Sequence, residues 1–120
     1  MQISKLIPNP TVRVELKYAP GFFVTLASQD SPAVRDVIHA NAERRILAMR
    51  GNKGKSATLD QMDAESVAVL KVAIEGIDDQ TGDGEPMAFT PENVDALLAI
   101  RWVREQLDAA LGNDALFFGA

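Results

Sequence analysis

The segment 89–118 constrains the fold more than any other part of the 120-residue chain, because it contains the strongest start signal for a helix. Thr90 is a residue type favoured at the N-cap, and Pro91 follows at the first helical position, where its missing N–H costs nothing. Phe89 and Val94 have the spacing of a hydrophobic staple around that start. The sequence therefore predicts a helix that begins at Pro91.

The apolar residues of this helix fall on two nearly opposite faces when the chain turns by about 100° per residue. The first face comprises Val94, Leu97 and Leu98, and the second comprises Ile100, Val103, Leu107 and Leu111. A straight helix cannot turn both faces toward one core. We therefore expect the segment 91–111 to be kinked or broken into helices 91–99 and 101–111. Gly112 gives a C-cap signal, so residues 112–120 are predicted to form a tail.

The first 28 residues predict an arm followed by a β-hairpin. Prolines at positions 8 and 10 disfavour regular structure in the arm, residues 1–10. Residues 11–17 alternate between apolar and polar side chains, and residues 22–28 are rich in aromatic and β-branched types. Pro20 and Gly21 supply the turn of the predicted hairpin, residues 11–28. Since two strands alone are marginally stable in water, we expect the hairpin to pack on helices or pair with another chain.

Two more helices are predicted between the hairpin and an acidic loop. Ser31 before Pro32 opens a helix over 31–50, which Gly51 and Gly54 should end. Its expected apolar face comprises Val34, Val37, Ile38, Ala42, Ile46 and Met49. A capping box at Thr58 opens a helix over 58–75.

The residues from Val67 to Ile74 are apolar on almost every side, so the second half of that helix should be buried. Their β-branched content makes a strand the alternative interpretation. Gly76 should end the element, and the acidic, glycine-containing segment 76–90 is predicted to be a loop. The chain as a whole is expected to form one α+β domain, 1–120. It would be mostly helical, with a two-stranded hairpin packed on about four helices.

Charge and composition exclude or disfavour several classes of function. The net charge of −5 disfavours a nucleic-acid partner, and no apolar run reaches the length of a membrane span. The absence of cysteine excludes disulfides and thiolate metal sites. The most basic segment holds Arg44, Arg45, Arg50, Lys53 and Lys55. Such a segment is interpreted first as a solvated loop and second as a patch that binds a partner.

No catalytic or cofactor motif is complete. The sequence Gly54-Lys55-Ser56 lacks the preceding glycine of a phosphate-binding loop, because Met49 occupies that position. Asp79 and Asp83 resemble the start of a calcium loop whose last ligand, a glutamate, is replaced by Thr90. His39 is the only histidine, and it falls on the polar side of its helix. We therefore expect no enzyme activity, no cofactor and no metal site.

Several short motifs resemble one family. They are PENVDALL at 91–98, WVREQLDAAL at 102–111, the final FF at 117–118, Gly21–Phe23, Asp30-Ser31-Pro32 and Gly82–Glu85. Together they resemble the small tail assembly chaperones of tailed bacteriophages, found also in prophages. The chain departs from the pattern at 74–77, where the family often has a tryptophan before the acidic turn.

The resemblance implies a non-enzymatic protein in the cytoplasm of the bacterial host. Such a protein would bind the tape-measure protein, help tail-tube subunits to assemble around it and be absent from the finished virion. One alternative is a minor structural component that the virion retains, and another is a small-molecule enzyme or regulator. Because open strand edges pair readily, we also expect a homodimer or larger ring built partly on the hairpin.

The residues proposed to bind the partner are Phe117, Phe118, Trp102, Arg50, Lys53 and Lys55. Two adjacent aromatic residues cannot both face the core from a regular helix or strand. Either one phenylalanine folds back beneath Trp102, or the exposed one, predicted to be Phe118, anchors a partner. In the second case Phe118→Ala should leave the melting temperature nearly unchanged and weaken partner binding.

Overall fold

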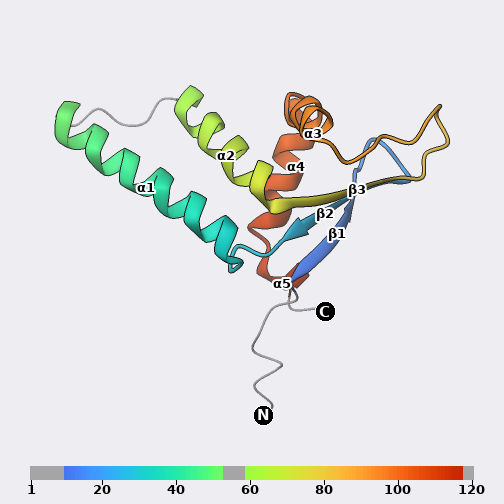
Figure 1. Ribbon diagram of the computed structural model, residues 1–120, viewed down its shortest axis with the longest axis horizontal. Helices are drawn as coiled ribbons and strands as arrows, with labels where there is room; N and C mark the ends of the chain where they lie inside the picture. Colours follow the sequence, from blue (N-terminus) through green and yellow to red (C-terminus); the bar gives the residue numbers. More distant parts are fainter. Residues whose placement is uncertain (1–9, 53–58, 118–120) are drawn as a thin grey trace, which may run out of the picture.

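The computed structural model describes residues 10–52 and 59–117, and the structural statements below refer to these residues. In chain order the elements are β1 (Thr11–Glu15), β2 (Phe22–Ala27), α1 (Pro32–Asn52), α2 (Leu59–Ala73), β3 (Ile74–Asp79), α3 (Pro91–Leu98), α4 (Arg101–Leu111) and α5 (Asp114–Phe117). The expected α+β class, with an N-terminal hairpin packed on helices, is confirmed (Figure 1). Lys53, Lys55, Phe118 and most of the N-terminal arm lie outside the described residues.

The sheet has three antiparallel strands in the order β1-β2-β3, so the expectation of two strands was wrong. On the buried face Val24 of β2 pairs with Val14 of β1 and with Ile77 of β3. The predicted helix over 58–75 ends at Ala73, and the first four residues of the predicted loop continue a strand that begins at Ile74. This strand forms because it pairs the second edge of β2, which a two-stranded hairpin would leave open.

The predicted break between α3 and α4 is confirmed. The Thr90 hydroxyl accepts a hydrogen bond of 3.2 Å from the Asn93 N–H, which caps α3. Ile100 has an extended backbone, with φ −85° and ψ 115°, and separates the two helices. As a result Val94 from the first face and Leu107 from the second are both buried in one core. Ile100 itself, expected on the second face, is 44% exposed because it lies in the bend.

The core lies between the inner face of the sheet and helices α2, α3 and α4. Its fully buried large side chains are Leu26, Leu70, Leu98, Leu107, Val24, Val34 and Val103. Leu26 and Val24 come from β2, the central strand, and Leu70 comes from the second half of α2. The predicted burial of that half is confirmed only in part, because Leu70 and Ala73 are buried whereas Val67, Val69 and Val72 are half-buried.

Helix α1 is only partly covered. It runs away from the sheet with α2 beside it (Figure 1), and Val34 near its start is buried. Ile46 is 52% exposed, so the expected apolar face is covered only toward the N-terminal end of the helix. The helix also passes through Gly51 and ends at Asn52, later than predicted. A glycine lowers helix propensity but does not by itself end a helix.

Candidate functional site

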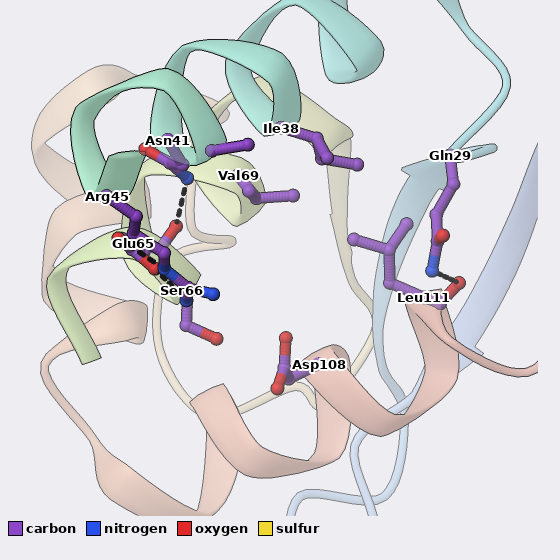
Figure 2. Close-up of a pocket in the computed structure, with 10 residues that line it drawn as sticks. Gln29, Ile38, Asn41, Arg45, Glu65, Ser66, Val69, Asp108 and Leu111 are labelled. Carbon is purple, nitrogen blue, oxygen red and sulfur yellow. Dashed lines mark hydrogen bonds and ion pairs between the residues drawn. The ribbon is translucent and has the colours of Figure 1, made fainter. Parts of the chain in front are cut away.

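An open groove lies between α1, α2 and α4 and encloses a volume of about 400 Å³ (Figure 2). Its lining residues are Gln29, Ile38, Asn41, Ala42, Arg45, Glu65, Ser66, Val69, Asp108 and Leu111. Binding pockets in proteins typically have volumes of roughly 300–1,000 Å³. The groove is therefore large enough to receive a few side chains of a partner.

The apolar part of the groove is contributed by all three helices. Ile38 of α1, Val69 of α2 and Leu111 of α4 point toward the same space in Figure 2. Ile38 and Val69 are half-buried, whereas Leu111 is buried. Ile38 and Ala42 are one helical turn apart, and continuing at that spacing along α1 leads to the exposed Ile46. The groove thus leads along α1 toward the exposed Ile46.

One end of the groove is closed by a polar junction between α1 and α2. The Arg45 guanidinium donates two hydrogen bonds to the Glu65 carboxylate, one of them 2.9 Å long from Nε. The buried Asn41 amide donates to the Glu65 carbonyl at 3.4 Å and accepts a hydrogen bond from Arg44. The Arg45 guanidinium lowers the pKa of Glu65, mainly by hydrogen bonding, and Glu65 raises the pKa of Arg45. Both side chains therefore remain charged near neutral pH.

The other end of the groove joins the start of α1 to the end of α4. The Gln29 side-chain amide donates a hydrogen bond of 2.9 Å to the carbonyl of Leu111. That carbonyl belongs to the last turn of α4, where main-chain acceptors have no partner within the helix. Gln29 therefore both caps α4 and fixes one wall of the groove.

The residues proposed from the sequence do not form one site. Phe117 is only 3% exposed in α5, so the proposal that it binds a partner is wrong, because its ring belongs to the core. Trp102 of α4 is half-buried and makes an edge-to-face contact with Tyr18, with ring centroids 5.0 Å apart. Arg50 is exposed in the last turn of α1. Trp102 and Arg50 thus remain candidate contacts on two separate elements.

Few features of the sequence predict the groove. Asn41 and Arg45 follow Ile38 at helical spacing, which places a polar pair beside an apolar residue on one face of α1. Glu65 belongs to no motif, and Asp108 lies within the motif at 102–111 without any chemical signature of its own. Both resemble ordinary surface carboxylates of amphipathic helices. Only the packing of three helices shows that these residues line one space.

In the acidic turn after β3, the Asp79 carboxylate stabilises the main chain by accepting hydrogen bonds. Asp79 Oδ1 accepts hydrogen bonds from the Thr81 hydroxyl at 2.6 Å and the Thr81 N–H at 3.1 Å. Its Oδ2 accepts from the Met87 N–H at 3.0 Å. These bonds lower the pKa of Asp79, the Thr81 hydroxyl contributing most. Within the described ranges, no group of three or more His, Cys, Asp or Glu residues is placed to hold a metal ion.

Part of the open edge of β1 is covered by a side chain of α4. Because Leu16 N–H bonds to Phe22 of β2, the main-chain groups of Glu15 and Lys17 point away from the sheet. The Gln106 amide donates to the Glu15 carbonyl at 2.8 Å and accepts from the Lys17 N–H at 3.0 Å. Gln106 therefore occupies the positions at which another strand would bind.

A search of the described helices finds none that is both long and apolar enough to cross a membrane. Comparisons of the chain with protein-family models, with curated proteins and with solved structures found no match.

Proposed function

We propose that this chain is a non-enzymatic tail assembly chaperone of a tailed bacteriophage or prophage. In this proposal it acts in the cytoplasm of the bacterial host, binds the tape-measure protein and assists assembly of the tail tube around it. The motifs at 91–98, 102–111 and 117–118 support the assignment through their resemblance to that family. The groove supports the mode of binding.

The single observation that carries the proposal is an apolar groove that continues along α1 toward the exposed Ile46. An amphipathic helix binds such a surface by placing apolar residues one turn apart into it. Ile38, Val69 and Leu111 would receive these side chains, and the exposed Ile46 would extend the contact along α1. A tape-measure protein that presents long apolar helical stripes before assembly would supply such a helix.

Co-expression with the tape-measure and tail-tube proteins of the same phage tests the proposal. We expect the tape-measure protein to copurify with this chain and to remain in solution longer than it does alone. Copurification of neither protein would contradict the proposal. Mass spectrometry of purified virions then distinguishes a chaperone from a retained structural component, because only the latter is found in the particle.

A further inference from the structure

The charges around the groove are balanced except at Asp108. At the α1 and α2 side of the groove Arg45 is paired with Glu65, and Arg44 donates to Asn41 and adds a second positive charge near Glu65. On α4 the Arg104 guanidinium lies 3.9 Å from the Asp63 carboxylate. The exposed Asp108 carboxylate projects from α4 toward the groove (Figure 2). Among the described residues no cation lies within ion-pair distance of it. The α4 side of the groove therefore presents one unpaired negative charge beside the apolar residues.

The position of Asp108 along its helix adds to this excess of negative charge. It lies in the last turn of α4, which ends at Leu111 and contains no basic residue. The carbonyl groups at the end of a helix carry a partial negative charge, so an acidic residue there is locally unfavourable and a cation is favourable. A residue that breaks a local rule for stability is a candidate for a functional role.

We propose that the groove selects a helical segment that presents a lysine or arginine beside its apolar anchor residues. The cation would lie beside the Asp108 carboxylate, near the negative end of the α4 dipole. The apolar anchors would pack on Ile38, Val69 and Leu111, together with the aliphatic stem of the basic residue. This inference deepens the proposed function by naming the charge pattern of the partner segment. The complementary charge argues for a basic helix rather than an acidic one.

Two synthetic helical peptides test the inference with the full-length chain. One carries leucine at positions i, i+4 and i+7 and lysine at i+3, and the other carries glutamate in place of the lysine. By isothermal titration we expect the lysine peptide to bind about threefold to tenfold more tightly. The preference should shrink as the salt concentration rises, because salt screens exposed charges.

Variants of α4 separate a local contact from net charge. Asp108→Asn should remove the preference for lysine, and Asp108→Lys should reverse it. Glu105→Lys makes the same change in net charge as Asp108→Lys, but one turn away, at an exposed position outside the groove. It should keep the preference for lysine. Asp108→Asn should also raise the melting temperature slightly while weakening the lysine peptide. If Asp108 served only to stabilise the fold, Asp108→Asn would lower the melting temperature instead.

Equal binding of the two peptides, or binding of neither, would overturn the inference. So would loss of the preference in Glu105→Lys. Fragments of the tape-measure protein distinguish this failure from failure of the proposed function. If they bind the wild type and both Asp108 variants equally, the inference fails and the proposed function stands. If only the lysine peptide binds, the proposed function fails and the inference stands.

Discussion

Arg45 of α1 and Glu65 of α2 are joined by two hydrogen bonds between guanidinium and carboxylate. The same stretch of α2 accepts a third bond at the Glu65 carbonyl, from Asn41. This junction forms where α1 begins to lose its cover, between the half-buried Ile38 and the exposed Ile46. It therefore holds α1 beside α2 at one end of the groove.

The junction predicts a contribution of Glu65 to stability that depends on pH. The pKa of Glu65 is lowered in the folded state, whereas an unfolded glutamate titrates near pH 4.3, an approximate reference value. The contribution is present above that pH and is lost as pH falls through the lower pKa of the folded protein. Melting temperatures between pH 7 and pH 2 should therefore fall less steeply for Glu65→Gln than for the wild type. Asp79, whose pKa is also lowered, should leave some acid sensitivity in the variant. Parallel curves for the two proteins would contradict the assignment.

Neighbouring residues of α5 provide a matched test of the tail. Phe117 is 3% exposed, whereas Leu116 is 44% exposed. Phe117→Ala should lower the free energy of unfolding by about 3–5 kcal/mol, because it leaves a cavity in the core. Leu116→Ala should change it by less than about 0.5 kcal/mol. Chemical denaturation measures both values, and similar losses would show that the buried position of Phe117 is wrong.

Two glycines with left-handed backbones allow the cost of backbone strain to be measured apart from the cost of a steric clash. Gly21 has φ +87°, and an added Cβ would lie 3.1 Å from the Gln80 carbonyl oxygen. Gly84 has φ +79°, and its Cβ would meet nothing within 4 Å. We expect Gly84→Ala to cost about 1–2 kcal/mol of stability through strain alone. Gly21→Ala should cost at least about 1 kcal/mol more, because the added Cβ would push the main chain at Gly21 away from the main chain at Gln80. Equal thermal destabilisation of the two variants would refute the close approach.

Gln106 provides a test of the edge of β1. Gln106→Ala removes both hydrogen bonds to that edge and should cost about 1 kcal/mol. The Lys17 amide should exchange its hydrogen faster, which hydrogen–deuterium exchange measures. Since an uncovered edge pairs readily, light scattering should also show more self-association in the variant than in the wild type. Wild-type protein that remains strictly monomeric at high concentration would contradict the predicted homo-oligomer.

Local signals in the sequence predicted local structure well. The N-cap at Thr90 and the start of α1 after Ser31 depend on side chains within one turn of the helix they open. The break before α4 was also predictable, because two opposite apolar faces cannot serve one core. The alternation of apolar and polar residues over 11–17 predicted β1, because the side chains on one face of a strand recur every two residues.

Features that depend on distant residues were not predictable in this way. β3 forms because Ile74 and Ile77 meet β2, which lies about 50 residues earlier in the chain. The apolar side of α1 suggested burial, but burial depends on whether another element reaches that face, and at Ile46 none does among the described residues. The groove requires α1, α2 and α4 together, so no single segment could reveal it.

The most direct test of the central claim is the affinity of this chain for helical fragments of the tape-measure protein, measured by isothermal titration. Ala42→Trp fills the groove from an exposed position on α1, and Ala96→Trp adds the same side chain on α3, outside the groove. We predict that a fragment binds the wild type and Ala96→Trp equally and binds Ala42→Trp at least about tenfold more weakly, a loss of about 1.4 kcal/mol. Absence of binding to every fragment, or equal binding to all three proteins, would contradict the claim.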